Sequence, residues 1–291
     1  MPELPDLTVY VEALATRLHG QPLRTVRLLK PFVLRSVQPS LESLLDVPVS
    51  AVKRLGKRIV LAFANGHFAA IHLMIAGRLH WSTDRPRKPP AHTLVVFGFD
   101  HGQLLLTEAG SKRRAALHLV ADRSALAALD PGGLELPGVE LAAFAARLRA
   151  ANHTLKRALT DPHICAGIGN SYSDEILHAA RLSPLKQTRQ LDDADIARLH
   201  AAVQTVLSTW TARLRAAAAD EFPDKVTAFH PQMAVHGRYK LPCPDCGSPV
   251  QRIVHSDREF NYCAMCQTGG KVLADRLLSR LLHDSFPREL A

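Results

Sequence analysis

The sequence predicts an α+β, multidomain protein in which a largely antiparallel β region precedes a helical region and a small cysteine-rich module. Three observations indicate this order. Up to about residue 120, apolar residues form short strand-like runs separated by turn signals such as Asn65-Gly66. From about residue 139 to 219 the apolar residues recur at helical spacing instead. Four of the five cysteines then lie between residues 243 and 266.

Within the β region, the first 20 residues predict a short lead and a helix, with Asp6 as a candidate N-cap. Two apolar runs, residues 52–64 and 67–81, are joined at Asn65-Gly66, a sequence typical of a two-residue hairpin turn. Residues 93–99 and 103–107 predict a second strand pair.

The Pro- and Gly-rich residues 131–138 predict a domain boundary. Beyond it we expect four helices, the last of them with Asp192 as its capping residue. Their predicted positions are 141–151, 154–160, 172–181 and from about residue 194 onward.

Composition narrows the class of partner. The 291 residues include 36 lysines and arginines against 27 acidic residues, a formal net charge of +9. Such a balance favours a polyanionic partner, with scattered surface lysines as the alternative. The longest apolar run, residues 69–77, contains His72 and is far shorter than the roughly 20 residues needed to span a bilayer. The N-terminus also lacks the features of a secretory signal, so we expect a cytoplasmic protein.

The cysteines give the firmest chemical signal. Cys243-Pro-Asp-Cys246 is followed, sixteen residues later, by Cys263-Ala-Met-Cys266. Two CxxC pairs at this separation are typical of four thiolates around Zn²⁺, and a four-thiolate site leaves no open position for catalysis. We therefore expect one structural zinc ion, with a β-hairpin over residues 250–262. Cys165 lies outside this array and is expected to be a packed thiol.

The N-terminus carries a second candidate site. Removal of Met1, which is normal before proline, would leave Pro2 with a free secondary amine beside the carboxylate of Glu3. An α-amine titrates near about 7.7–8.0, so a useful fraction is neutral and nucleophilic at cellular pH. Attack on an aldehyde-type sugar carbon gives an iminium, which makes elimination easy. Taken alone, however, Met-Pro-Glu is an ordinary start to a chain.

A third signal is the sequence Ala166-Gly-Ile-Gly169-Asn170 at the start of a predicted helix. Backbone N–H groups at such a start attract an anion, and Asn170 is a candidate cap and amide donor. Lys156 is placed to add a positive charge, although an ordinary interhelical turn would also explain the glycines. Arg258, expected on the hairpin facing away from the metal, is a candidate phosphate ligand or simply a solvated side chain.

Together these motifs resemble the formamidopyrimidine-DNA glycosylase / endonuclease VIII family, from residue 1 to about residue 267. The matching positions are the opening Pro2-Glu3-Leu4-Pro5, a hairpin lysine at Lys57, His72-Leu73 with Gly77, the helix–two-turn–helix signature Gly167-Ile168-Gly169-Asn170 with Tyr172 and Glu175, and a zinc finger comprising Val235, Gly237-Arg238, Arg258 and the four cysteines.

The resemblance implies a domain plan. An N-terminal β-sandwich with an N-terminal helix would occupy residues 1–130, and a helix–two-turn–helix DNA-binding domain residues 139–230. The zinc finger would follow at 235–270, and a C-terminal helical extension at 271–291. The implied partner of this monomer is double-stranded DNA with a damaged or abasic nucleotide, bound in the cleft between the domains.

The resemblance also implies a base-excision-repair DNA glycosylase with AP lyase activity. Pro2 would attack C1′ and Glu3 would protonate the leaving base or the sugar ring oxygen. The Schiff base would then eliminate both phosphates. Lys57 and Arg258 would assist at the phosphates, together with Lys156, Asn170 and Gly169.

Several departures from the family pattern leave the lesion open among oxidised purines, oxidised pyrimidines and abasic sites. Asp6 replaces a glutamate, and the residue that fills the space of the flipped base is Ile75 or Met74. Residues 107–114 stand where the family has an Asp-Pro-Arg-Arg-Phe loop, and they lack the apolar side chain that acts as a wedge in that loop. Arg113 is the candidate DNA ligand in this segment. The alternatives are a non-catalytic binder of damaged or abasic DNA on the same scaffold and, on charge and cysteines alone, a zinc-ribbon protein associated with RNA.

Overall fold

The computed structural model describes the chain except residues 87, 111, 225–228, 256–257 and 274–291, and it gives only the backbone of His255 and Arg258. The chain divides into two compact units. Unit 1 comprises Met1–Pro131 and Trp210–Thr227, and unit 2 comprises Gly132–Thr209 and Ala228–Ala291. Among the described residues, no helix is both long and apolar enough to cross a membrane.

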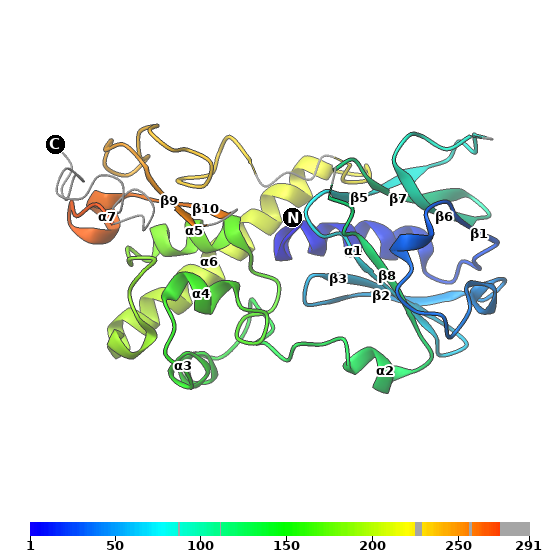
Figure 1. Ribbon diagram of the computed structural model, residues 1–291, viewed down its shortest axis with the longest axis horizontal. Coiled ribbons are helices and arrows are strands. Elements are labelled where there is room, and N and C mark those ends of the chain that lie inside the picture. The colour runs from blue at the N-terminus through cyan, green and yellow to red at the C-terminus, as the bar shows by residue number, and fades with distance from the viewer. Residues whose placement is uncertain (87, 111, 225–228, 256–257, 274–291) are drawn as a thin grey trace. The chain divides into compact units, whose positions relative to one another are not determined.

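Unit 1 is built from two four-stranded antiparallel sheets, with the strand orders β1-β6-β7-β5 and β2-β3-β4-β8 (Figure 1). This confirms the expected β-sandwich. The strands are β1 (Thr25–Leu28), β2 (Val49–Leu55), β3 (Arg58–Phe63), β4 (Phe68–His72), β5 (Gly77–Ser82), β6 (Thr93–Phe99), β7 (Gly102–Glu108) and β8 (Ala116–Val120).

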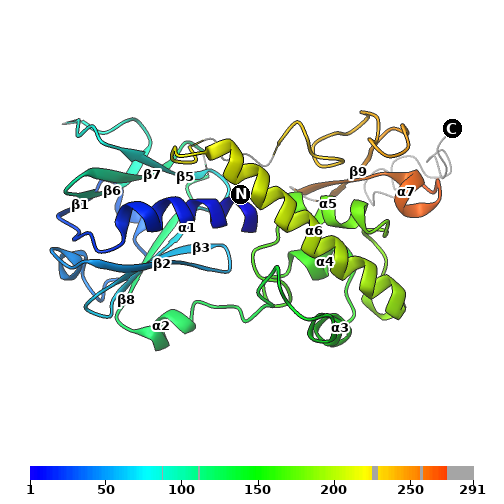
Figure 2. The ribbon, with the colours of Figure 1, turned by 180° about the vertical axis from the view of Figure 1, so that it is seen from behind.

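Helix α1 (Leu4–Leu18) packs against β2 and β3 and buries one side in the core of unit 1 (Figure 2). Its fully buried apolar residues join those of both sheets in a single hydrophobic cluster, so apolar burial holds the three layers together. Two 3₁₀ turns, Pro31–Val33 and Leu41–Leu44, and the short helix α2 (Arg123–Ala127) complete this part of the chain.

The hairpin at Asn65-Gly66 forms as predicted, between β3 and β4. Gly66 has a φ of +85°, a backbone conformation that glycine adopts without steric cost. Each flanking run is nevertheless two strands and not one. Residues 52–64 are broken by the turn at Gly56-Lys57, and residues 67–81 by a turn after His72 that sends β4 and β5 into different sheets.

Unit 2 is helical, with a small ribbon. Its helices are α3 (Leu141–Arg149), α4 (Leu155–Thr160), α5 (Asn170–Ala179), most of α6 (Asp193–Ala218) and α7 (Ala264–Thr268), with a 3₁₀ turn at Thr188–Gln190. The ribbon is the antiparallel pair β9 (Gln251–His255) and β10 (Arg258–Tyr262), which confirms the predicted hairpin. The Asp192 side chain accepts a hydrogen bond of 2.7 Å from the Asp195 N–H, as expected of a cap.

Two other predicted caps are wrong. Helix α1 begins at Leu4, two residues before Asp6, and its N-cap is Glu3. Helix α5 takes Gly169 as its N-cap, so Asn170 is already its first helical residue. In both cases the side chain that was expected to cap the helix makes another contact. Asp6 accepts the Glu3 N–H, and Asn170 donates to the Glu259 carbonyl. The helical extension expected after residue 271 lies almost wholly outside the described residues.

The core of unit 1 gives a stability prediction. Phe97 in β6 is fully buried in the cluster, so Phe97→Ala removes a large apolar side chain and leaves a cavity. We expect it to lower the free energy of unfolding by about 3–5 kcal/mol, measured by urea denaturation. Val37 is 87% exposed, and Val37→Ala should change it by less than about 0.5 kcal/mol. Equal effects of the two substitutions would contradict this assignment of the core.

Candidate functional site

The N-terminal segment of unit 1 is buried. Pro2 is buried, and Glu3 is only 3% exposed. Glu3 caps α1 through a reciprocal pair of hydrogen bonds: its side chain accepts from the Asp6 N–H, and its own N–H donates to Asp6 Oδ2 at 2.8 Å. Asp6, one methylene shorter than glutamate, therefore still closes a capping box and fixes the backbone beside Pro2.

Charged groups surround this segment. The pKa of the Met1 amine is lowered, first by burial and also by the positive charges of Arg78 and Lys57, while Glu3 and Asp6 act in the opposite direction. Lys57 comes from the turn between β2 and β3, and Arg78 from β5. Burial also raises the pKa of Asp6 to about 7. The fold thus brings Pro2, Glu3 and Lys57 into one electrostatic neighbourhood.

The turn between β4 and β5 presents the two candidates for filling the space of a flipped base. Ile75 is 58% exposed at this turn, whereas Met74 is half-buried and has a φ of +52°. His72 Nδ1 accepts the Met74 N–H at 3.0 Å, and burial lowers the pKa of His72 to about 4, so the ring is neutral and able to accept. The turn is therefore held rigidly, with Ile75 toward solvent.

Two neighbours brace this turn. A Cβ at Gly77 would lie 2.2 Å from the Leu73 carbonyl oxygen, so only glycine fits there. Arg78 donates to the carbonyl of Ile75 at 3.2 Å. Sequence reasoning matched Gly77 to the family but missed Arg78, which carries no motif of its own.

The basic loop after β7 lies beside the same turn. A Cβ at Gly110 would come within 2.9 Å of the Ala76 Cβ. The buried Glu108 closes the loop, because its Oε1 accepts the N–H groups of Arg114 at 2.9 Å and Ala115 at 3.0 Å. Arg113 is exposed and stands 5.9 Å from the ring centroid of Phe32. The loop is basic at its surface, as the sequence indicated.

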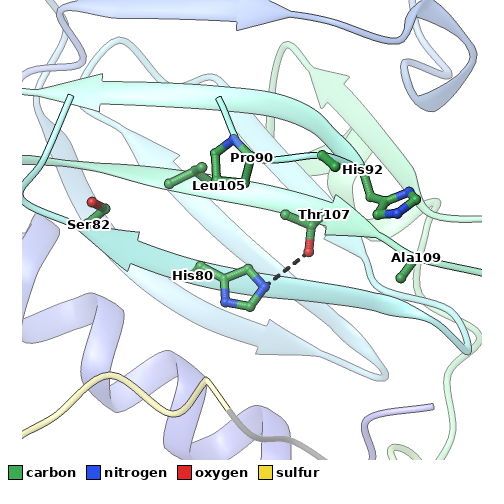
Figure 3. A pocket seen from close by; sticks show the side chains of 8 residues that line it. His80, Ser82, Pro90, His92, Leu105, Thr107 and Ala109 are labelled. Carbon is green, nitrogen blue, oxygen red and sulfur yellow. Dashed lines mark hydrogen bonds between the residues drawn. The ribbon is translucent and has the colours of Figure 1, made fainter. Parts of the chain in front are cut away.

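A hollow of about 340 Å³ lies on the same sheet (Figure 3). His80 Nε2 is 3.1 Å from Thr107 Oγ1 at its wall, and His80 Nδ1 is 3.2 Å from Asp224. The sheet residues Ser82 and Leu105 and the loop residues Pro90–His92 enclose it. Through its contact with Asp224, His80 links the sheet to the segment after α6, whose residues 225–228 lie outside the described part of the chain.

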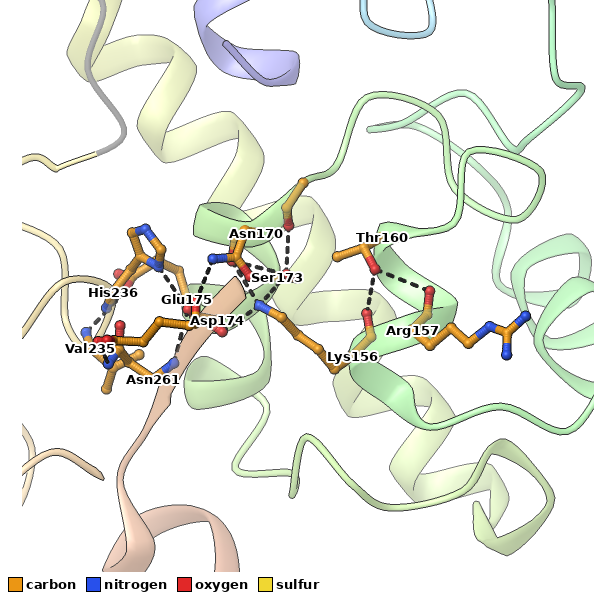
Figure 4. Close-up of polar contacts among 12 residues, drawn as sticks. Lys156, Arg157, Thr160, Asn170, Ser173, Asp174, Glu175, Val235, His236 and Asn261 are labelled. Atoms are coloured by element: carbon orange, nitrogen blue, oxygen red, sulfur yellow. Dashed lines mark hydrogen bonds and ion pairs between the residues drawn. The ribbon is translucent and has the colours of Figure 1, made fainter. Parts of the chain in front are cut away.

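In unit 2 the start of α5 meets the ribbon (Figure 4). Lys156, only 8% exposed, donates to the Asn170 carbonyl and the Ser173 hydroxyl, each at 2.8 Å, and forms an ion pair with Asp174. The Asn170 side-chain amide donates to the Glu259 carbonyl of β10 at 2.6 Å. The structure therefore gathers Lys156, Gly169, Asn170 and the backbone next to Arg258, while the Arg258 side chain itself lies outside the description.

Two adjacent carboxylates of α5 hold the loop that precedes the ribbon. Glu175 accepts the backbone N–H groups of Ala234, Val235 and His236 at 2.7–3.0 Å. Asp174 Oδ2 accepts from the Asn261 N–H at 3.1 Å and contacts His236 Nδ1 at 2.7 Å. The sequence marked Glu175 through the family signature, whereas Asp174 and His236 are visible only in the fold.

The four cysteines of the array converge. Their sulfur atoms all lie within 4.8 Å of one another, with Cys243–Cys266 at 3.9 Å and Cys246–Cys263 at 3.4 Å. Four sulfur atoms about 2.3 Å from one tetrahedral ion would lie about 3.8 Å apart, so the cluster fits a four-thiolate metal site. Cys165 is fully buried elsewhere, and burial raises its pKa to about 12, as expected of a packed thiol.

Comparisons with known proteins agree with this fold. A model of the formamidopyrimidine-DNA glycosylase N-terminal domain matches residues 1–115, and a model of the helix–two-turn–helix domain of the same glycosylase matches residues 132–215. Fold and site together thus define a DNA glycosylase of the helix–two-turn–helix class, a class that works in base excision repair.

Full-length relatives give the family. A formamidopyrimidine-DNA glycosylase of Desulforamulus reducens is 32% identical over 92% of this chain and 99% of its own length. An uncharacterized formamidopyrimidine-DNA glycosylase-like protein of Mycobacterium tuberculosis is 41% identical over 53% of this chain and 94% of its own length. The chain belongs to the formamidopyrimidine-DNA glycosylase family.

Solved structures share the fold. The Lactococcus lactis Fpg in complex with an abasic site containing DNA superposes with a TM-score of 0.81 at 24% identity, covering 91% of this chain and 99% of that one. MutM in complex with carbocyclic 8-oxo-G containing DNA gives a TM-score of 0.80 at 23% identity, covering 92% and 100%.

The raised pKa of Asp6 predicts a pH dependence of stability. The folded chain keeps this proton up to about pH 7, whereas the unfolded chain loses it near the ordinary aspartate pKa of 3.8. The folded state binds the extra proton between these values, so the contribution of Asp6 to stability should fall as the pH rises through this window and level off above it. His72, whose pKa is lowered to about 4, contributes in the opposite direction, so the fall is read from the difference between the parent and the Asp6 variant. Asp6→Asn cannot lose the proton and should remove this fall, as measured by urea denaturation across pH. Asp220→Asn, at an exposed position, should leave the fall intact.

The left-handed conformation of Met74 predicts a second stability effect. A β-branched residue is disfavoured at a φ of +52°, whereas glycine is not. We expect Met74→Val to be less stable than Met74→Gly by about 1–2 kcal/mol in thermal or urea unfolding. Ile75→Val, at the neighbouring exposed position, should change stability by less than about 0.5 kcal/mol. Equal stabilities of the two Met74 variants would rule out strain at this turn.

Proposed function

We propose that this chain is a bifunctional DNA glycosylase and AP lyase, which removes an oxidised base and nicks the strand through a Schiff base on Pro2. The supporting observation is the buried start of α1, where the capping box fixes Glu3 beside Pro2 and where burial, with Arg78 and Lys57 nearby, lowers the pKa of the Met1 amine. Once Met1 is removed, the Pro2 amine would stand in the same surroundings. A neutral secondary amine is the form that attacks carbon.

The proposed reaction begins when the Pro2 nitrogen attacks C1′ of the damaged nucleotide. The bond between C1′ and the base breaks, its electron pair leaves with the base, and Glu3 supplies a proton to the base or to the ring oxygen. Ring opening gives an iminium between Pro2 and C1′. Loss of a proton from C2′ then expels the 3′ phosphate (β-elimination), and a second elimination expels the 5′ phosphate. Water finally releases the sugar fragment and restores Pro2.

The remaining site residues would serve binding. Lys57, Lys156, Gly169, Asn170 and Arg258 are proposed to hold phosphates around the extruded nucleotide, whose extrusion costs a few kcal/mol. The charge of Lys156 is already paired with Asp174, so its part would be to hold the Asn170 carbonyl and with it the first turn of α5, whose N–H groups would face a phosphate. Ile75, more exposed than Met74, would fill the vacated space, and Arg113 would contact the strand beside it.

The domain plan and partners follow from this proposal. The N-terminal catalytic domain, the helix–two-turn–helix domain, the zinc finger and the tail would lie at 1–130, 139–230, 235–270 and 271–291, and one zinc ion would occupy the four-cysteine site. The zinc would fix the ribbon and take no part in the chemistry, because four thiolates complete its coordination. The substrate would be double-stranded DNA with an oxidised or abasic nucleotide, bound by a monomer in the bacterial cytoplasm. Solved relatives hold abasic and 8-oxo-G containing DNA.

Blocking the Pro2 nitrogen tests the proposal directly. Inserting one glycine between Met1 and Pro2 turns that nitrogen into an amide, which is not nucleophilic, while changing no side chain. Borohydride trapping on duplexes with an abasic site, 8-oxoguanine or an oxidised pyrimidine should give an adduct with the Met-trimmed chain. The inserted chain should bind the same duplexes without an adduct.

Each outcome is informative. The pattern of adducts over the three duplexes names the lesion class. Undiminished trapping with the inserted chain would exclude Pro2 as the nucleophile. Tight binding by the trimmed chain with no adduct on any duplex would favour the alternative, a non-catalytic binder of damaged or abasic DNA, which the basic loop from Lys112 to Arg114 also suits.

A further inference from the structure

Helix α5 faces the ribbon with a row of polar side chains spaced four residues apart. Asn170 donates to the Glu259 carbonyl at 2.6 Å, and Asp174 accepts the Asn261 N–H at 3.1 Å. The third member, His178, reaches the metal site: its Nε2 lies 3.3 Å from Cys243 Sγ. Residues four apart share one face of a helix, so a single face of α5 docks the ribbon.

The histidine is well placed for a fixed contact. His178 is 3% exposed, and Cys243 is 2% exposed, so water does not compete for the bond between them. With an ion bound, Cys243 Sγ is a thiolate that carries no proton and can only accept. The imidazole must then be the donor, through Nε2–H. Such a hydrogen bond draws negative charge away from a cluster in which four thiolates surround one divalent ion.

We propose that His178 donates a hydrogen bond to the metal-bound Cys243 thiolate and thereby holds the metal in its four-cysteine site and keeps the adjoining ribbon on α5. This inference rests on the proposed metal site. Groups that hydrogen-bond metal ligands fix the ligand's orientation, and their loss typically weakens metal binding by about 10–100-fold. The same contact ties the metal to the helix whose first turn carries Asn170, so loss of the ion would also loosen the docking of the ribbon.

A second possible metal site shares His178 and one cysteine with the arrangement proposed above. His178 Nε2 is 3.9 Å from Asp245, and the ligand atoms of His178, Asp245 and Cys266 lie within 4.8 Å of one another. These three could in principle hold an ion directly. Cys266 is already needed for the four-sulfur site, however, and the sulfur of Cys243 is nearer to Nε2 than the Asp245 carboxylate is. The geometry therefore favours a donor to the thiolate over a direct ligand.

The first test measures how fast zinc leaves the full-length, zinc-loaded protein. His178→Phe keeps a ring of similar size but has no donor, and the exposed His163→Phe is the matched control in the same unit. Under excess chelator with a zinc-responsive dye, we expect His178→Phe to release zinc at least about tenfold faster than the parent and His163→Phe to match the parent. A difference of less than about twofold between His178→Phe and the parent would overturn the proposal.

The second test uses the unaltered protein and so does not depend on a variant folding. Loaded with cadmium-113, the protein should show an NMR coupling between the ion and the Nε2–H proton of His178, carried across the N–H···S bond. Absence of this coupling, a direct cadmium–nitrogen coupling or two ions per chain would each overturn the proposal. A parent protein that binds no ion at all would instead refute the metal site itself, while leaving the Pro2 chemistry untouched.

Discussion

The second unit depends on two neighbouring carboxylates that are buried on one helix. Asp174 and Glu175 are 1% and 5% exposed, and a buried charge is tolerated only when it is paired and hydrogen-bonded. Asp174 pairs with Lys156 and contacts His236, while Glu175 takes three backbone N–H groups from the loop before the ribbon. Removing one partner of such a buried pair typically costs about 3–5 kcal/mol. The start of α5 and the ribbon are therefore joined by charged and hydrogen-bonded contacts, in addition to the apolar packing of Ile253 and Tyr262.

In the first unit, the packing of α1 encloses the charged residues at the N-terminal end of the chain. Helix α1 is held by a large apolar cluster, and its N-terminal turn continues into Pro2 and Glu3. The capping box pairs the backbone N–H groups of Glu3 and Asp6, which lowers the cost of enclosing this segment. Burial and two nearby cations then favour the neutral amine. Stability and the proposed nucleophilicity thus have a common origin in the packing of α1.

Two of the regions proposed to bind DNA are held in shape by local contacts. The turn that presents Ile75 is fixed by His72, Gly77 and Arg78, and the basic loop is closed by Glu108. Each is therefore preorganised, which lowers the entropy lost when a ligand binds. Most departures from the family pattern fall in these loops, and the one in the first turn of α1, Asp6 in place of glutamate, keeps the capping box. This distribution fits a protein that keeps its chemistry and differs in the base it selects.

The sequence alone determined what depends on local pattern: the α+β class, the Asn65-Gly66 hairpin, the four-cysteine array and the family, because turn chemistry, residue period and ligand spacing act over short stretches of chain. It did not determine which residues cap α1 and α5, because Asp6 and Asn170 are residue types that cap helices well when judged by local sequence. In the tertiary structure the Asp6 side chain instead accepts the Glu3 N–H, and the Asn170 side chain donates to the ribbon. The partners of Lys156 and the approach of His178 to Cys243 were likewise set by the fold. Those contacts join residues far apart in the chain, and their energy comes from burial, which no local pattern encodes.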